Sequence, residues 1–358
     1  MRAAVLSAFG QPLAIEELTP PPLGPHDVRV RVEASGVCHS DLSVAQGKLP
    51  SPLPMVLGHE GSGTVLELGG AVDQLAIGDR VIASFVPACG ACWSCANGEG
   101  HLCTASADAR QAVRGTRTDG STVTAMSGLG TFADIMTTGA ASVVKVETDL
   151  PADQLALLGC AVTTGVGAVL NTANVRAGAT VAVIGAGGVG QAVVQGARIA
   201  GASRILVVDP VALKREAART AGATDVIDPA EGDPVAQLLD ATGGRGVDDA
   251  FEVVGHPDTI LQAFGAARRG GTVVIVGMAG GGATVSFPAN RLFADAKRIL
   301  GCFYGSAAIR RDFPRMIRLI EAGRLDVGSM VSRHLRLDEV DEGFRAMEAG
   351  EVIRSVIT

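Results

Sequence analysis

Four of the seven cysteines in this chain of 358 residues lie close together, at Cys89, Cys92, Cys95 and Cys103. Four thiolates at such short spacing suit a tetrahedral structural zinc, which keeps no coordination position open for a reactant. Thiolates also bind iron–sulfur clusters, and disulfides or unligated thiols are the remaining alternatives. The stretch "ANGEGH" inside this segment has almost nothing apolar to bury. We therefore predict a structural zinc that holds this lobe together.

Two further cysteines and a histidine stand in separate contexts: Cys38 in "ASGVCHSDLSV", His59 in "VLGHEGSGTV" and Cys160 in "ALLGCAVTTGVGAV". Two cysteines and a histidine around one open position are a known pattern for a catalytic zinc, which acts as a Lewis acid on a substrate oxygen. Taken separately each residue is ambiguous, because a buried cysteine is usually a small core residue. Their joint context indicates a metal site. The seventh cysteine, Cys302, indicates only a buried strand.

A glycine-rich turn, Gly185-x-Gly187-x-x-Gly190, directly follows a predicted strand and directly precedes a predicted helix. In this context Gly185 permits the turn, Gly187 lets a pyrophosphate approach the backbone, and Gly190 lets the helix pack on the sheet. The helix N-terminus then offers amide donors and the positive end of its dipole to the phosphates. Gly188 is predicted to bind the cofactor with them. The alternative is a glycine turn that holds no ligand.

The next predicted strand ends at Asp209, whose carboxylate would accept hydrogen bonds from the adenosine ribose hydroxyls and repel a 2′-phosphate. Lys214 lies within reach of the same ribose. The residue after Asp209 is Pro210, whereas an arginine at that position would have left NADP as an alternative cofactor. We therefore predict NAD as the cofactor.

The elements that must position these residues change in type along the chain. Residues 1 to about 160 are rich in short strands, such as the period-two run "VRVRVEASGV". From about residue 175, buried strands alternate with helices, which is typical of βαβ units in a parallel sheet covered on both faces. After about residue 305, amphipathic helices are followed by short closing strands. We predict an α/β chain in which residues 163–304 form a doubly wound parallel sheet, inserted into a β-rich domain of residues 1–162 and 305–358.

The composition argues against several classes of partner. The formal net charge is −7, and the sequence has no cluster of lysine and arginine that could bind a phosphate backbone. We therefore expect no nucleic acid partner. The first residues lack the pattern of a signal peptide, and the apolar runs are short and broken by glycine. We therefore expect a cytoplasmic protein without a membrane segment. An odd number of cysteines in such a chain favours metal binding over disulfides.

Together these motifs make the chain resemble a zinc-containing medium-chain alcohol dehydrogenase of the longer type, which carries a structural-zinc lobe. The resemblance runs essentially from end to end and covers "GVCHSD", "GHEGSG", the four-cysteine lobe, the "GC" of Cys160, "GAGGVG" and the terminal "IRSVI". It implies a GroES-like catalytic domain, an inserted Rossmann domain and a cleft between them. It also implies two zinc ions per chain, one catalytic and one structural, and a homodimer joined across its Rossmann sheets near residues 300–304.

The resemblance further implies roles around the catalytic zinc. Cys38, His59 and Cys160 match its three ligands, with water or substrate in the fourth position. Glu60 matches a residue that approaches the metal during ligand exchange. Asp41 matches a carboxylate that orients the ligand histidine.

Other positions match residues that handle the proton, the cofactor and the substrate. Ser40 matches the hydroxyl that accepts the alcohol proton, and hydride then passes to the nicotinamide. His39 and Arg354 match contacts to the cofactor pyrophosphate, although each could instead be a surface charge. Four apolar positions match the substrate pocket, or could equally be core, and they favour an apolar alcohol over a polyol. They are Leu49, Phe85, Leu129 and Met278.

The chain departs from the family pattern at two places. Many relatives carry a histidine where this chain has Ser43, so the last step of the proton relay must use water or another base. Relatives that oxidise the glutathione adduct of formaldehyde carry an arginine where this chain has Ala107, although Arg110 and Arg114 are near in sequence. The second departure makes a thiol-adduct substrate less expected without excluding it.

We therefore expect an NAD-dependent zinc alcohol dehydrogenase that acts on primary aliphatic or aromatic alcohols and the corresponding aldehydes. Two other enzymes remain open: a dehydrogenase of a formaldehyde–thiol adduct, and an alcohol oxidoreductase that keeps its nicotinamide cofactor permanently bound. Outside enzymes, the alternative is a non-catalytic dinucleotide-binding protein stabilised by zinc.

Overall fold

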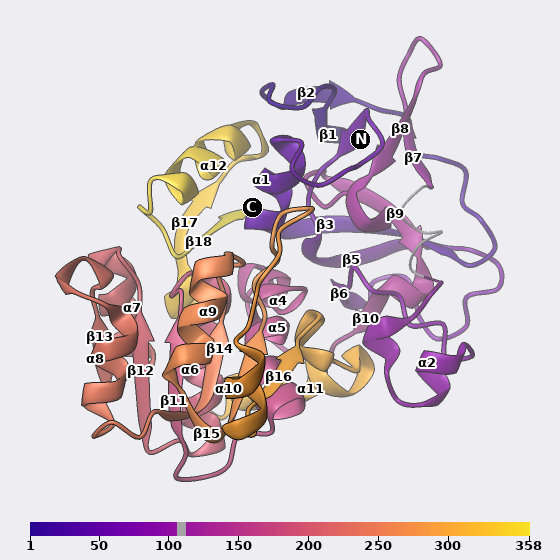
Figure 1. Ribbon diagram of the computed structural model, residues 1–358. Coiled ribbons are helices and arrows are strands. Elements are labelled where there is room, and N and C mark those ends of the chain that lie inside the picture. Colours follow the sequence, from indigo (N-terminus) through magenta and orange to yellow (C-terminus); the bar gives the residue numbers. More distant parts are fainter. Residues whose placement is uncertain (106–111) are drawn as a thin grey trace. The chain divides into compact units, whose positions relative to one another are not determined.

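The computed structural model describes residues 1–105 and 112–358, and the chain divides into two compact units (Figure 1). The first unit comprises Met1–Cys160, Ala308–Arg318 and Val327–Thr358. The second comprises Ala161–Ala307 and Leu319–Asp326. Ala107 and Arg110, which the sequence singled out, lie outside the described residues.

The first unit is built on two β-sheets, as its period-two runs predict. The smaller sheet has the strand order β2-β1-β4-β8-β7, and the larger has the order β10-β6-β5-β3-β18-β17, with β9 also pairing with β3. The smaller sheet consists of β1 (Arg2–Leu6), β2 (Ala14–Glu17), β4 (Met55–Val56), β7 (Val113–Thr116) and β8 (Thr122–Ala125). The larger consists of β3 (Asp27–Val37), β5 (Glu60–Leu68), β6 (Arg80–Ala83), β9 (Ile135–Gly139), β10 (Val143–Lys145), β17 (Val331–Leu335) and β18 (Arg354–Ile357).

The pairing of β3 with β5 brings distant parts of the sequence together. These strands are antiparallel, and Gly36 near the end of β3 lies opposite Glu60 at the start of β5. Cys38 follows β3 and His59 directly precedes β5. Because antiparallel partners meet end to start, both side chains emerge at the same edge of the sheet.

Helices complete the first unit and carry the remaining site residues. Helix α1 (His39–Ala45) continues directly from Cys38, and α4 (Ala152–Leu158) packs its buried leucines on β3 and β5 and ends just before Cys160. The described part of this unit also contains the α-helices α2 (Trp93–Ala96) and α12 (Val340–Glu348), and α11 (Ile309–Glu321) crosses from the first unit into the second. No single helix among the described residues is long and apolar enough to cross a membrane; α4 and the helical segment Ala161–Ala173 meet that test only as a bent pair.

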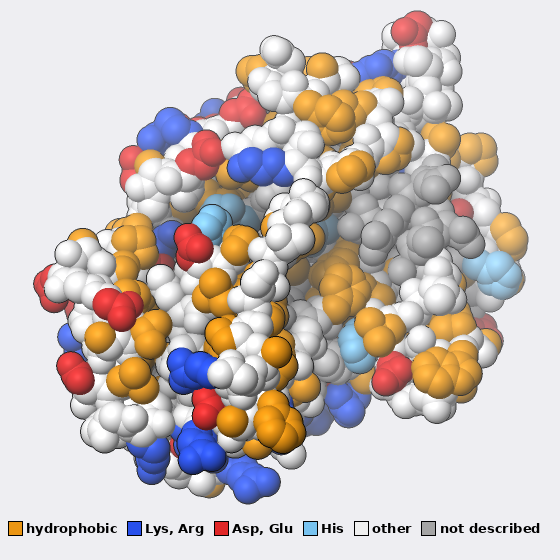
Figure 2. Space-filling model, in the orientation of Figure 1, with side chains coloured by type: hydrophobic (Ala, Val, Ile, Leu, Met, Phe, Trp, Pro, Cys, Tyr) orange, Lys and Arg blue, Asp and Glu red, His pale blue; other side chains and the backbone are white. Residues whose placement is uncertain are grey.

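The second unit contains a parallel sheet with the order β13-β12-β11-β14-β15-β16, which is the doubly wound arrangement predicted from the sequence. Its strands are β11 (Thr180–Ile184), β12 (Arg204–Val208), β13 (Asp225–Ile227), β14 (Val247–Glu252), β15 (Ala267–Ile275) and β16 (Arg298–Gly301). Its helices are α5 (Ala161–Gly167), α6 (Gly188–Ala200), α7 (Ala212–Ala221), α8 (Pro234–Ala241), α9 (Pro257–Ala266) and α10 (Ala289–Ala294). Charged side chains of both signs lie over α7 to α10 on the face seen in Figure 2.

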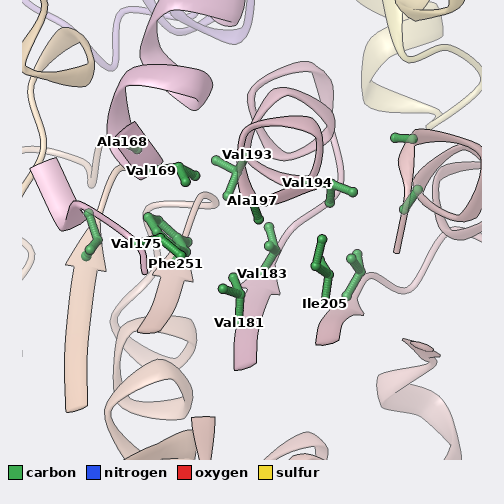
Figure 3. Close-up of a cluster of buried hydrophobic side chains, with 14 of the residues drawn as sticks. Ala168, Val169, Val175, Val181, Val183, Val193, Val194, Ala197, Ile205 and Phe251 are labelled. Carbon is green, nitrogen blue, oxygen red and sulfur yellow. The ribbon is translucent and has the colours of Figure 1, made fainter. Parts of the chain in front are cut away.

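Both faces of this sheet are buried, as its continuous Val and Ile runs predict. On one face α6 packs Val193, Val194 and Ala197 toward strand residues of β11, β12 and β14 (Figure 3). The alternate residues of the same strands face a second cluster, which includes Leu238 of α8 and Phe264 of α9. Neighbouring strand residues therefore point to opposite faces, and the helices fix the strand ends from which the candidate binding residues project.

Candidate active site

One set of candidate metal ligands lies at the edge formed by β3, β5 and α4. The ligand atoms of Cys38, His59, Cys160 and Glu60 all lie within 4.8 Å of one another, and all four residues are buried. The ligands of one tetrahedral zinc lie about 3–4 Å apart, given zinc bonds of roughly 2.0–2.3 Å. Two soft sulfurs and an imidazole at this spacing fit a zinc ion that keeps a position open for a reactant.

Asp41 fixes the orientation of two of these ligands. Its carboxylate is fully buried and accepts hydrogen bonds from His59 Nδ1 (2.9 Å) and from the backbone N–H groups of Cys38 (2.9 Å) and Gly58 (3.1 Å). Because Nδ1 of His59 is engaged, Nε2 is the nitrogen left for a metal. The contacts therefore support the positioning role that the resemblance implies for Asp41.

The Asp41→Asn variant is expected to lower the zinc affinity of this site by about 10- to 100-fold. Three donors face the carboxylate, and an asparagine would turn its own NH₂ group toward at least one of them. Zinc retention against a competing chelator measures the loss. Asp153→Asn is the control, since the Asp153 carboxylate pairs with the exposed His334 and accepts a hydrogen bond from Gln154 N, and it should retain zinc like the parent protein.

Cys38 interacts with both Cys160 and His59, and these contacts shift the pKa of each of the three candidate ligands. Hydrogen bonding with Cys160 holds the pKa of Cys38 well below its ordinary value, while the same contact and burial raise the pKa of Cys160. Burial lowers the pKa of His59, but Asp41 and Cys38 outweigh burial and raise it. The thiolate form favoured at Cys38 is the form that binds a metal.

A buried ion pair lies beside the ligands. The Arg354 guanidinium pairs with the Glu60 carboxylate, and the two side chains are 5% and 0% exposed. Burial raises the pKa of Glu60 to about 7, against the opposing effect of Arg354. Within the described residues, Glu60 Oε1 and Arg354 Nε have no hydrogen-bond partner. The structure thus places Arg354 against Glu60, and its predicted contact with a cofactor stays a prediction.

The first turn of α1 brings a hydroxyl to the ligands. Ser40 is half-buried and its Oγ lies 3.8 Å from Cys38 Sγ. His39, the first residue of the helix, is exposed. Ser43 lies one turn further along the helix and is half-buried. A hydroxyl beside the candidate metal ligands is therefore available to move a proton, while Ser43 has no ionisable side chain.

The four predicted pocket residues fall in different environments. The rings of Phe85 and His59 are nearly perpendicular, with ring centroids 5.6 Å apart. Leu129 is only 1% exposed and packs in the same hydrophobic cluster as Phe85, whereas Leu49 packs against a different cluster. Met278 belongs to the second unit and is 57% exposed. Phe85 is thus the residue of this group with a described contact to a candidate metal ligand.

In the second unit the glycine turn has the backbone that its sequence predicts. Gly185 has a φ of +97°, and a Cβ there would lie 2.7 Å from Val254 Cγ2. A Cβ on Gly190 would overlap the carbonyl oxygen of Gly185, so the helix packs tightly on the turn. A Cβ on Gly187 would meet no described atom within 4 Å, and Gly188 begins α6 directly after it. The open space at a helix N-terminus fits a pyrophosphate.

Asp209 directly follows β12 beside this turn and is 5% exposed. Its carboxylate accepts hydrogen bonds from Ala186 N and Val211 N, both at 2.8 Å. Each oxygen keeps a further lone pair, so the carboxylate can still accept from a ribose hydroxyl. Lys214 is half-buried in α7, and its carbonyl accepts a hydrogen bond from Gln191 Nε2 (3.0 Å).

Two buried polar residues at this edge were missed from the sequence. Gln191 follows the glycine motif and links Ala186 O to Lys214 O. Glu252 ends β14 and binds the turn that follows it. Each carried a usable signal, since a polar side chain at the end of a buried strand or at a helix N-terminus needs a partner.

The four remaining candidate ligands form a second site in the first unit. The sulfurs of Cys89, Cys92, Cys95 and Cys103 lie within 4.8 Å of one another. Backbone N–H groups point at the sulfurs, and those of Cys95 and Thr104 help to lower the pKa of Cys92 to about 6. Four sulfurs at this spacing fit a tetrahedral zinc with no open position, as predicted.

The comparisons with known proteins agree with this geometry. Residues 24–148 match the family described as alcohol dehydrogenase GroES-like domain, and residues 188–322 match the family described as zinc-binding dehydrogenase. The chain is 37% identical to the S-(hydroxymethyl)glutathione dehydrogenase of Synechocystis, over 99% of both chains. It is 38% identical to the NDMA-dependent alcohol dehydrogenase of Amycolatopsis methanolica, over 99% of this chain and 98% of that protein.

A solved structure extends the likeness to three dimensions. The benzyl alcohol dehydrogenase of Acinetobacter calcoaceticus is 32% identical, with a TM-score of 0.93 over 99% of this chain and 98% of that one. These matches confirm the predicted GroES-like and Rossmann fold, and the donor sets described above fit two zinc ions. The chain therefore belongs to the zinc-containing medium-chain alcohol dehydrogenases, and it is a zinc-dependent oxidoreductase of small alcohols or aldehydes.

Proposed function

We propose that this enzyme transfers hydride between NAD and primary aliphatic or aromatic alcohols and aldehydes. The observation that carries the proposal is the Cys38–His59–Cys160 set, oriented by Asp41 and bordered by Ser40 and Phe85. Support for the aromatic class comes from Phe85 and from the benzyl alcohol dehydrogenase that the chain resembles. The apolar side chain at Phe85 favours a substrate without further polar groups near the reacting carbon.

The protein residues would divide the work as follows. When bound at Cys38, His59 and Cys160, zinc supplies Lewis-acid polarisation of the alcohol oxygen, and NAD accepts the hydride. Asp41 holds the His59 ring so that Nε2 keeps its direction. Ser40 Oγ accepts the alcohol proton and passes it on. Because Ser43 cannot take up that proton, we propose that water receives it.

NAD is proposed over NADP because of Asp209. A 2′-phosphate beside its nearly buried carboxylate would meet an uncompensated negative charge, whereas two ribose hydroxyls would find an acceptor. The Gly187 side of the turn is proposed to receive the pyrophosphate, with Gly185, Gly188 and Gly190 shaping the approach. His39 and Arg354 are proposed as further contacts to the cofactor pyrophosphate on family resemblance, and Lys214 is proposed as a contact to the ribose because it follows Asp209 closely in the sequence.

The Asp209→Ser variant is expected to lower the ratio of kcat/KM for NAD to that for NADP by at least about tenfold. The physical reason is the loss of a charged acceptor, worth about 1.5–3 kcal/mol for each hydrogen bond, together with the loss of repulsion toward phosphate. Steady-state kinetics with both cofactors measure the ratio. An unchanged ratio would show that Asp209 does not set the preference.

Two other substrates or acceptors are supported by named relatives. The likeness to an S-(hydroxymethyl)glutathione dehydrogenase supports a formaldehyde–thiol adduct as an alternative substrate. Arg114 is buried, and its nearest described acidic partner, Asp27, lies 3.9 Å away. The likeness to an NDMA-dependent alcohol dehydrogenase supports an enzyme that retains its nicotinamide and passes electrons to an external acceptor.

A single panel separates these functions. Purified enzyme is tested with aliphatic and benzylic alcohols plus NAD or NADP, with formaldehyde plus several thiols, and with alcohols plus NDMA and no added nucleotide. Reduction of free NAD by benzylic or aliphatic alcohols without thiol supports the leading proposal. Strict thiol dependence, or turnover only with NDMA, would replace it by the corresponding alternative.

We also propose that the chain forms a homodimer through the edge of its second sheet. Strand β16 is the edge strand of that sheet, and one of its sides has no partner strand among the described residues. Phe293 and Phe303 nearby are 88% and 46% exposed. Figure 2 shows hydrophobic side chains among charged ones over the area where Figure 1 places α10. The proposed cytoplasmic location is supported by the seven cysteines, all of which are free of disulfides.

A further inference from the structure

We propose that Glu252 is a positioning residue for the nicotinamide cofactor, because its buried side chain fixes the turn that packs against the glycine motif. This inference rests on the cofactor-binding role proposed above for the second unit. It goes further by assigning cofactor affinity to a residue outside the glycine motif and outside the ribose-binding Asp209.

Glu252 occupies the point of the sheet where ligands of such folds bind. It is the last residue of β14, and it lies opposite Ile184 at the end of β11 and Ile275 at the end of β15. The strand order reverses between β11 and β14. In doubly wound sheets the ligand lies outside the carboxyl ends of the strands at this switch point.

The side chain of Glu252 is fully buried and holds the turn that follows it. Its Oε1 accepts hydrogen bonds from Val254 N (2.9 Å), Gly255 N (2.7 Å) and Thr259 Oγ1 (2.7 Å). Its Oε2 has no partner among the described residues. Three donors on one oxygen mean that removal of the carboxylate leaves the whole turn without its anchor.

The backbone of Glu252 anchors the next turn as well. Its carbonyl oxygen accepts hydrogen bonds from Val276 N (2.8 Å) and Gly277 N (3.0 Å), directly after β15. A Cβ on Gly277 would overlap the backbone nitrogen of Gly255, and a Cβ on Gly255 would lie 2.6 Å from the carbonyl carbon of Met278. The turns after β14 and β15 are therefore packed backbone against backbone.

The anchored turn also bounds the glycine motif. A Cβ on Gly185 would lie 2.7 Å from Val254 Cγ2. Any shift of the turn that contains Val254 would therefore change the space beside the glycine motif. Val254 and Met278 are 52% and 57% exposed at this edge. The exposed apolar side chains of Val254 and Met278 lie beside the proposed phosphate-binding turn and form a surface suited to an apolar part of the cofactor.

The test compares four variants of the full-length zinc-loaded enzyme. Glu252→Ala removes the acceptor, Glu252→Asp withdraws it by one methylene, and Glu252→Gln keeps an oxygen for the three donors. Asp249→Asn is the matched control, since Asp249 is a buried carboxylate of the same strand that lies away from the turn. Fluorescence titration gives the Kd for NADH, and steady-state kinetics give KM for NAD, KM for alcohol and kcat.

We expect Glu252→Ala to raise the Kd for NADH and the KM for NAD at least about tenfold, because the released turn must be reordered on binding. Its zinc content, its KM for alcohol and its kcat at saturating NAD should stay within about threefold of the parent values. Glu252→Gln and Asp249→Asn should bind NADH within about threefold of the parent.

Other outcomes overturn the inference. It is wrong if folded Glu252→Ala binds NADH like the parent, or if Asp249→Asn weakens binding as much. Should Glu252→Ala fail to fold, Glu252→Asp decides: at least a fivefold rise in Kd supports the inference, and an unchanged Kd overturns it. Failure of the parent enzyme itself to bind NADH or NADPH would instead count against the proposed function.

Discussion

The Cys38→Ser variant is expected to lose alcohol turnover while keeping its affinity for NADH. The thiol of Cys38 is one of three groups that fit the catalytic zinc, and a serine hydroxyl is a poor ligand for this ion at neutral pH. Without the metal the alcohol oxygen loses several kcal/mol of charge stabilisation, so kcat/KM should fall at least about 1,000-fold. Cofactor binding should persist, because the glycine turn belongs to the other unit of the chain.

Three measurements check this expectation. Steady-state kinetics give the loss of activity, metal analysis should show a fall from two zinc ions per chain to one, and fluorescence titration reports NADH binding. Cys302→Ser is the control, since Cys302 is a buried cysteine of the second unit that belongs to neither ligand group. Substantial alcohol oxidation by the Cys38→Ser enzyme with one zinc per chain would contradict the proposed mechanism.

The second large effect is expected from the four-cysteine lobe. Cys103→Ser should remove the structural zinc, because Cys103 is one of its four sulfurs and is 3% exposed. The lobe has little else to hold it: Trp93 is 75% exposed and Leu102 is 46% exposed. Zinc binding supplies about 10–16 kcal/mol of folding free energy in small zinc peptides, so its loss should unfold the lobe.

The expected readouts are a lower melting temperature and rapid proteolysis in residues 89–103. Zinc content should again fall from two to one per chain, but the freshly purified enzyme should keep most of its kcat, because the catalytic ligands remain in place. The two cysteine variants therefore separate the two metals. If Cys38→Ser and Cys103→Ser lost the same share of activity and kept the same melting temperature, the two zinc sites would not differ in role.

The fold was predictable because its signals are local. Continuous runs such as residues 181–184 indicated strands buried on both faces, and the helices between them indicated a parallel sheet. The lobe was predictable for the same reason, since four cysteines at short spacing are close in space whatever the rest of the chain does.

The catalytic ligands were not predictable in this way. Cys38 and His59 lie close together because Gly36 pairs with Glu60. Cys160 follows helix α4, which comes much later in the sequence. No periodicity specifies that register, so the set was predicted from the joint context of the three residues and from family resemblance. The ion pair of Glu60 with Arg354 joins positions 294 residues apart, and the sequence had suggested only a cofactor contact for the arginine.

The contacts of individual side-chain atoms could not be read from the sequence either. Glu252 looked like the end of a strand, and only the structure shows three donors on its Oε1. Leu129 could have been pocket or core, and its 1% exposure places it among core side chains in this structure. Such distinctions depend on packing, which a linear pattern does not encode.

Zinc-edge anomalous diffraction from crystals of the purified enzyme tests the central claim most directly. The account predicts two peaks per chain: one among the four lobe sulfurs, and one bonded to Cys38 Sγ, Cys160 Sγ and His59 Nε2, with His59 Nδ1 on Asp41. A chain with no metal among Cys38, His59 and Cys160, or with that position bound through His59 Nδ1, would contradict it.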